Sequence, residues 1–210
     1  FESILIWTKT GLWRLTGSGT SPLTSRLTNE FEGVGCLSHH SIVYTGSSVA
    51  WMGNDGFYTW APGQAKPTRI SDPDGVTPAV GIAGTFGRIN LLHARNVFGH
   101  YDQERGFIRW LVPMDGSSTN RHALVYEPTT GRWAGPWEYP DLTWIVTVTG
   151  LDGTLRNLAG DVYGDVWEID VGTVDGYFGA EPKQAITAST TRTITCGAAS
   201  FSTTGDGLKG

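Results

Sequence analysis

The chain has 210 residues, of which 39% are hydrophobic and 17% charged, and its formal net charge is −5. This composition lacks the excess of basic residues that is typical of nucleic-acid-binding proteins. The sequence contains no run of 18 apolar residues, which argues against a transmembrane helix. Glycine, at 29 residues, is about twice its average share of ~7%. Nine tryptophans predict a core that is aromatic rather than rich in leucine.

Taken in chain order, the apolar residues alternate or form runs of four to six, which is typical of short β-strands and not of helices. Four segments share one pattern, in which an apolar strand and a polar turn ending in glycine precede an aromatic strand. They are residues 4–16, 49–60, 123–133 and 158–169. A fifth hairpin is predicted over residues 97–112. We expect the turns to depend on glycines that can adopt positive φ, namely Gly11, Gly56, Gly106, Gly131 and Gly164.

The spacing of these hairpins predicts packed sheets, because an isolated hairpin is marginally stable and must bury its apolar face. Residues 86–135 fit one four-stranded propeller blade of about 40–50 residues, and residues 142–172 fit a shorter one. We therefore predict an all-β fold, a β-propeller-like array of antiparallel hairpin blades with four to five blades visible. This domain covers residues 1–180. Residues 181–210 are rich in threonine and small polar residues, which predicts a β extension or a truncated tail.

No catalytic or metal-binding group stands out in the sequence. Most acidic residues sit beside glycine or proline, where their side chains cap turns, and no pair is nominated for the two carboxylates of a glycosidase. His39 and His40 would point to opposite faces of a regular strand and so could not share a metal ion. Cys36 and Cys196 are expected to be free thiols more readily than a disulfide. We predict no enzyme activity, no metal and no cofactor.

The tryptophans have two interpretations. They recur at equivalent hairpin positions, which favours contacts between blades, but exposed indole rings could also stack on sugars. Trp60 and Trp137 lie next to proline-containing segments and are predicted to be surface aromatic contacts.

An ordered set of short motifs resembles tailed-bacteriophage virion structural proteins. After Gly35-Cys36 and Ser41-Ile42, the motifs are DGFY at residues 55–58, ISD at 70–72, YDQER at 101–105, WLVP at 110–113, LVY at 124–126, TGRW at 130–133, GDVW at 164–167 and DVGTVDG at 170–176. The resemblance spans roughly residues 1–190. It implies a virion tail or neck protein with a propeller-like domain, of the kind that includes the nozzle and tail tubular proteins of short-tailed phages.

This resemblance implies a structural component of the virion, assembled in the bacterial cytoplasm, that forms part of a ring around the DNA conduit. The expected partners are other tail or neck proteins and further copies of the chain, with no membrane insertion and no sequence-specific nucleic-acid binding. The acidic balance fits a conduit that does not grip DNA, because acidic walls repel phosphates. The alternative is a carbohydrate-binding propeller, either a lectin or a receptor-binding module. A propeller glycosidase is a third possibility.

Overall fold

The structure, a computed structural model, describes residues 3–17, 25–71 and 82–170 together with three strands between residues 185 and 202. It contains four antiparallel sheets and very little helix, so the all-β prediction is confirmed. In each sheet the strands that follow one another in sequence are also hydrogen-bonded neighbours. Every sheet is therefore a simple meander, and none of the described strands crosses between sheets.

The four sheets are built in chain order. The first contains β1 (Ser3–Trp7), β2 (Gly11–Thr16) and β3 (Arg26–Glu32), and the second contains β4 (Val43–Tyr44), β5 (Val49–Met52), β6 (Phe57–Trp60) and β7 (Thr68–Arg69). The third contains β8 (Phe98–Asp102), β9 (Phe107–Val112), β10 (His122–Glu127) and β11 (Arg132–Glu138). The fourth contains β12 (Leu142–Thr149), β13 (Leu155–Asp161), β14 (Val166–Ile169), β15 (Ala185–Ala188), β16 (Thr193–Cys196) and β17 (Ala199–Ser202).

Among the described residues, three short helices lie in the connections. They are the 3₁₀ helix η2 (His39–Ser41), the single α-helical turn α1 (Ala83–Phe86) and the 3₁₀ helix η3 (Leu91–Asn96). Within the part of the chain that the structure describes, no helix is long and apolar enough to cross a membrane.

All five predicted hairpins are present, as the pairs β1–β2, β5–β6, β8–β9, β10–β11 and β13–β14. Gly106, Gly131 and Gly164 have φ values of 73°, 70° and 91°, as a tight turn requires. Gly11 and Gly56 were expected to do the same, and that expectation was wrong. Neither has positive φ, and at each position a Cβ atom would collide with another group: the carbonyl oxygen of Phe31 at Gly11, and the Ser71 hydroxyl at Gly56.

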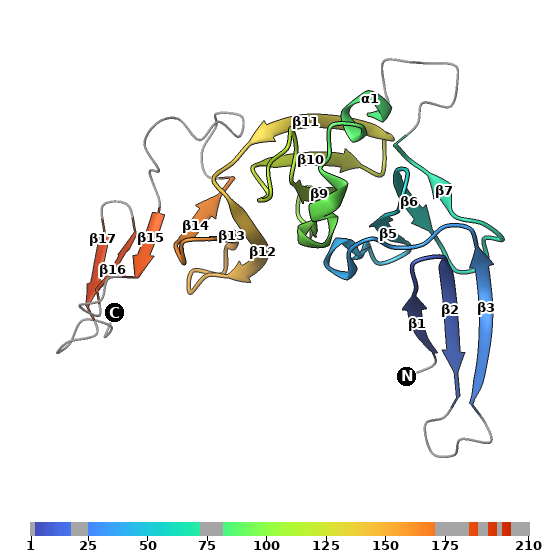
Figure 1. Cartoon of the computed structure of the whole chain (residues 1–210). Helices are drawn as coiled ribbons and strands as arrows, with labels where there is room; N and C mark the ends of the chain where they lie inside the picture. The colour runs from blue at the N-terminus through green and yellow to red at the C-terminus, as the bar shows by residue number, and fades with distance from the viewer. Residues whose placement is uncertain are drawn as a thin grey trace.

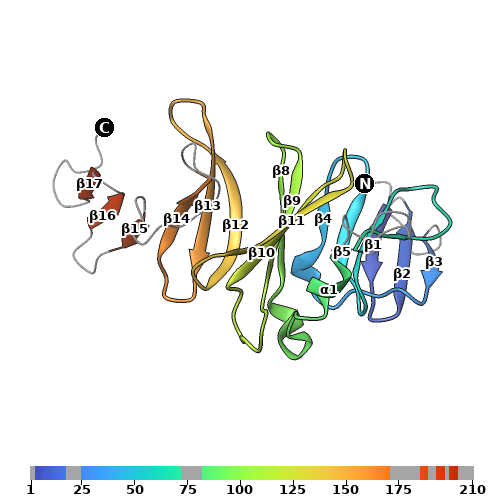
Figure 2. The same cartoon turned by 90° about the horizontal axis from the view of Figure 1, so that it is seen from above.

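The sheets follow one another along an arc, each packed face to face against the next (Figures 1 and 2). Leu12 of the first sheet packs with Trp51 of the second. Phe57 of the second packs with Trp110 of the third, with ring centroids 4.5 Å apart. Leu111 of the third sheet belongs to one apolar cluster with residues of the fourth. Three apolar clusters thus fill the three interfaces between successive sheets.

Burial along the strands reflects this order. All four residues of β5 are buried, and so are the last five of β9, because the second and third sheets are covered on both faces. In the two end sheets, the residues of β1 are exposed or half-buried, and β12 mixes buried with exposed positions, as expected for sheets covered on one face. Strand β8 contacts both β4 and β12, so the first strands of three successive sheets lie close together.

This arrangement is that of consecutive blades, while closure into a propeller stays a prediction. The predicted domain boundary at residues 180 and 181 lies outside the described residues, and the division into two domains also stays a prediction. Strands β15, β16 and β17 fall within residues 181–210 and continue the fourth sheet from β14.

Candidate functional site

Tryptophans from the motifs join segments that are far apart in the sequence. The indole N–H of Trp110 donates to the carbonyl of Ser41 (2.9 Å), and that of Trp133 donates to the carbonyl of Ile70 (2.7 Å). The two rings stack on each other with centroids 5.6 Å apart. Both tryptophans belong to the third sheet, and their acceptors flank the second. Residues of the WLVP, TGRW and ISD motifs therefore meet at one sheet interface.

The next interface, between the third and fourth sheets, contains a buried polar cluster that we call the Arg109 network. Its members are His100, Asp102, Arg109, Thr147, Asn157 and Asp170. The β8–β9 register pairs His100 with Arg109 and Asp102 with Phe107, so these side chains all leave the third sheet on the face turned toward the fourth. Thr147 and Asn157 are paired on β12 and β13 and project from the fourth sheet toward them.

Arg109 and Asp170 form the centre of the network. The Arg109 side chain is 0% exposed, and its Nη2 donates to both carboxylate oxygens of Asp170, at 2.7 and 2.8 Å. The Nε and Nη1 atoms of Arg109 have no hydrogen-bond acceptor in the part of the chain that is described, and the guanidinium lies 5.2 Å from the ring centroid of Phe107. Asp170 directly follows β14 and has a φ of 66°, a left-handed conformation that Asp tolerates better than most residues.

The amide of Asn157 connects the two buried carboxylates. Its Nδ2 donates to Asp102 at 2.7 Å and to Asp170 at 3.1 Å. Arg105 adds a more exposed cation 3.1 Å from Asp170, and its backbone N–H donates to Asp102. Two carboxylates are thus held by two arginines and one amide, which satisfies charges that would otherwise be costly to bury.

His100 and Thr147 are fixed in one hydrogen-bonding direction. Thr147 donates its hydroxyl proton to Oδ1 of Asn157 (2.7 Å), so it must accept from Nε2 of His100 (2.9 Å). Burial, reinforced by the charge of Arg109, lowers the pKa of His100 to about 4, and the ring is neutral at pH 7. His100 therefore cannot act as a base toward Thr147. The arrangement orders two sheets and does not activate this hydroxyl as a nucleophile.

A small cavity of about 210 Å³ lies beside the network and is lined by charged side chains of both signs, including Glu104, Arg105, Arg156 and Glu168. A larger cavity, which we call the junction pocket, has a volume of about 560 Å³ and lies where η2, η3, β8 and β12 meet. Volumes of about 300–1,000 Å³ are typical of small-molecule sites.

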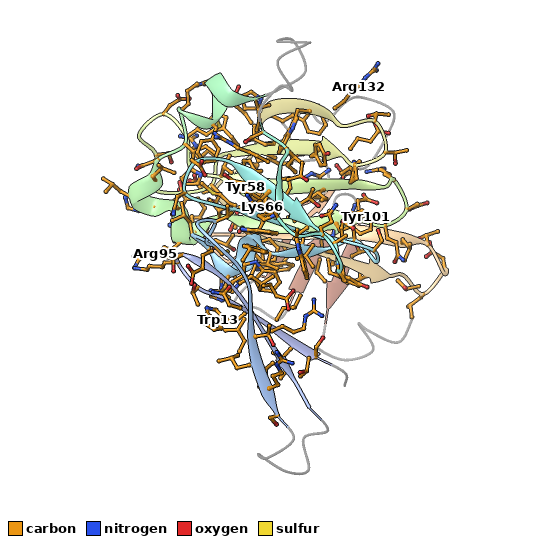
Figure 3. All side chains as sticks on the ribbon, turned by 90° about the vertical axis from the view of Figure 1, so that its right-hand side faces the viewer. Trp13, Tyr58, Lys66, Arg95, Tyr101 and Arg132 are labelled. Carbon is orange, nitrogen blue, oxygen red and sulfur yellow. The ribbon has the colours of Figure 1, made fainter. Side chains whose placement is uncertain are left out.

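The junction pocket has aromatic walls. Phe98 and His40 stack with ring centroids 6.1 Å apart, and Trp144, which is 36% exposed, lines the same cavity. Asn120 and Arg95 supply polar groups, and Nδ2 of Asn120 donates to the carbonyl of Asn96 (2.6 Å). The Arg95 side chain marks this part of the molecule in Figure 3.

Neither tryptophan predicted to be a surface contact lines the junction pocket. Trp60 is 1% exposed, packs in the cluster between the first and second sheets and donates to the carbonyl of Gln64, so the prediction of an exposed ring was wrong. Trp137 is half-buried and paired with Ala123. It lies in a strand rather than a loop because β11 continues through Gly135 and Pro136. Trp144 was not singled out from the nine tryptophans. The alternating pattern of residues 142–149 could have indicated it, because in a strand Trp144 and Ile145 lie on opposite faces and only one of the two faces is buried in the core.

The two adjacent histidines also differ from expectation. His39 and His40 form a 3₁₀ turn and not a strand, and their ring centroids are 3.7 Å apart. Within the described residues, no group of three or more His, Cys, Asp or Glu side chains could hold a metal ion. Cys36 is a free thiol whose pKa is raised by burial. The side chain of Cys196 lies outside the described residues.

No family model and no curated protein matches the chain. Among solved structures, the chain is similar to the extracellular domain of a one-component system from B. thetaiotaomicron, at 13% sequence identity and a TM-score of 0.44, over 93% of this chain and 25% of that one. The chain therefore spans about a quarter of the solved chain it matches, and a likeness at this level carries no argument about function.

Proposed function

We propose that the chain is a structural component of a phage virion tail or neck and forms part of a ring around the DNA conduit. One observation carries the proposal. Several residues of the motifs on which the resemblance to virion proteins rests lie in the interfaces between sheets, among them Trp110, Trp133, Asp102 and Asp170.

The motif residues of two interfaces illustrate this point. Trp110 and Trp133, from WLVP and TGRW, connect the third sheet to the second through hydrogen bonds to backbone carbonyls. Asp102 and Asp170, from YDQER and DVGTVDG, meet at Asn157 between the third and fourth sheets. Residues used in this way fix the angle between neighbouring sheets, which is the property that a load-carrying ring requires.

The charge of the chain is consistent with this role. With a net charge of −5, a ring of several copies would surround DNA with an acidic protein. Such a wall would repel phosphates and release no counterions on contact, so DNA could pass without being retained.

The test is to identify the chain in purified virions. An antibody against the recombinant chain should label tails or necks in negative-stain images, and mass spectrometry of purified particles should find the chain in a fixed copy number above one. Particles that lack the chain, although the infected cells contain it, would refute the proposal.

The junction pocket favours carbohydrate binding as a second candidate, because Trp144 and Phe98 offer aromatic surface beside polar side chains. A glycan array is the test. Binding that Trp144→Ala abolishes would support this candidate. The matched control is Tyr163→Ala, because Tyr163 is an exposed aromatic residue outside the pocket. The absence of binding to any glycan would remove this candidate and leave the structural proposal intact.

A further inference from the structure

The lining of the junction pocket differs in charge from the rest of the chain. The chain has 20 acidic and 15 basic residues. Among the described residues, no aspartate or glutamate lines the pocket, and its charged or titratable side chains are those of Arg95, His39 and His40. In a protein that is acidic overall, a pocket lined in this way favours an anionic ligand.

Arg95 is the permanent cation of this lining. It lies in the last turn of η3, and its side chain is exposed (Figure 3). Elsewhere Arg88 and Arg156 each pair with a carboxylate, at 2.7 and 2.9 Å, whereas Arg95 has no carboxylate partner in the part of the chain that the structure describes. A guanidinium in this position is available to a carboxylate on a ligand, which it can bind through two parallel hydrogen bonds.

The hydroxyl groups of the lining have already donated their protons within the protein. Ser38 and Thr143 donate to backbone carbonyls, at 2.8 and 3.0 Å, and Thr119 donates to the carboxylate of Asp141 at 2.6 Å. That carboxylate also lies 3.5 Å from Nε of Arg121. A hydroxyl has one proton and two lone pairs, so these three groups have only acceptor capacity left for a ligand.

Asn120 is a further acceptor in the lining. Its side chain is 3% exposed, and Nδ2 donates to the carbonyl of Asn96 at 2.6 Å, which fixes the direction of the amide. Its Oδ1 is buried and has no hydrogen-bond donor among the described residues. A buried acceptor without a donor is costly. The neutral side chains of the pocket therefore suit a ligand that is rich in hydroxyl groups.

Two aromatic rings supply the apolar surface. Trp144 is 36% exposed, and the ring of Phe98 stacks on that of His40. A sugar ring has an apolar face of C–H groups, which can pack on such a ring, and hydroxyl groups around its edge. The volume of about 560 Å³ is in the range of small-molecule sites.

We propose that the junction pocket binds an acidic sugar, a saccharide unit that carries a carboxylate. The sugar ring packs on the aromatic surface, its hydroxyl groups donate to the acceptors of the lining, and its carboxylate pairs with Arg95. This inference rests on carbohydrate binding as the function of the pocket, and it deepens that function by naming the class of sugar and the residue that selects it.

The experiment is a glycan array probed with the full chain. The array presents glycans that contain uronic or sialic acids beside their carboxyl-reduced counterparts, in which a neutral hydroxymethyl group replaces the carboxylate. Isothermal titration calorimetry then measures the acidic glycan that binds best, and its reduced counterpart, against the unmodified chain and two variants.

Arg95→Met removes the charge and keeps most of the length of the side chain. The matched control is Arg132→Met, because Arg132 is also exposed and lies on β11, outside the pocket (Figure 3). Circular dichroism and thermal unfolding confirm that each variant is folded.

The unmodified chain and the Arg132→Met control should bind the acidic glycan about tenfold more tightly than its reduced counterpart, because a hydrogen-bonded charge pair is lost on reduction. In Arg95→Met the affinity for the acidic glycan should fall about tenfold, while the affinity for the reduced counterpart stays the same. The preference for the acid then disappears.

Three outcomes overturn the inference. Binding that Trp144→Ala abolishes but that shows no preference for acidic glycans would overturn it and leave carbohydrate binding intact. A preference that persists in Arg95→Met would do the same. The absence of binding to any glycan would overturn both. The presence of the chain in purified virions is a separate measurement, so the structural proposal stands or falls independently of these results.

Discussion

Removing the charge of Asp170 tests whether the Arg109 network holds the third and fourth sheets together. We choose Asp170→Asn because asparagine also tolerates the φ of 66° at this position and has nearly the same shape. The substitution leaves the Arg109 guanidinium, at 0% exposure, without its anionic partner at 2.7 Å.

Breaking a buried ion pair from one side costs about 3–5 kcal/mol. The new amide keeps part of the hydrogen bonding, so the lower end applies and we expect a loss of about 3 kcal/mol in the free energy of unfolding. With a urea dependence of about 3 kcal/mol per molar, the unfolding midpoint should fall by about 1 M.

Urea unfolding followed by tryptophan fluorescence measures this change. Asp152→Asn is the matched control, because Asp152 also pairs with an arginine, Arg156 at 2.9 Å, but at the protein surface. The control should shift the midpoint much less. Arg109→Met should also cost less than Asp170→Asn, since it removes the buried cation and leaves Asp170 paired with Arg105 at 3.1 Å. A loss below about 1 kcal/mol for Asp170→Asn, the value of an ordinary surface pair, would refute the reasoning.

Three further changes test other parts of the fold. Trp60→Ala should lower the free energy of unfolding by about 3–5 kcal/mol in urea titrations, because the ring is 1% exposed. A loss under about 1 kcal/mol would show that the ring is not part of the core. The pKa of His100 is about 4 when folded and 6.5 when unfolded, so the unfolded chain binds more protons between these values. The stability that His100 contributes is therefore complete above pH 6.5 and decreases by about 3 kcal/mol as the pH falls to 4. His100→Gln should remove that component from the pH profile, and an unchanged profile would contradict the assignment. Gly35→Ala should lower the free energy of unfolding by at least about 3 kcal/mol, because its Cβ would overlap the backbone of Lys9. Gly106→Ala meets open space and should lower it by about 1–2 kcal/mol, because of its positive φ alone. Equal losses in thermal unfolding would contradict this reasoning.

The hairpins were predictable because the information that specifies them is local. The pairs β8–β9 and β10–β11 each depend on alternating apolar residues and on a turn glycine with positive φ, Gly106 or Gly131. Both signals lie within about a dozen residues. The same local reasoning failed at Gly56, where the reason for glycine is the hydroxyl of Ser71, on a segment that only the folded sheet brings close.

The candidate site was predictable only in part, because its contacts connect distant residues. Arg109 and Asp170 are 61 positions apart, and nothing near either one indicates its partner. The motif resemblance included Asp102 and Asp170, but it assigned them no contact. Trp60 was misplaced for the same reason, since its burial depends on the first sheet.

The packing of each sheet only on its neighbours has a consequence for synthesis. As the chain leaves the ribosome, the first sheet can form before the second exists, and each new sheet covers the face that its predecessor left open. Strands β5 and β9 are apolar on both faces and would promote aggregation if they stayed exposed. Each is therefore covered once the next few dozen residues have been synthesised. Among these four sheets, each newly made sheet thus covers the open face of the sheet made before it.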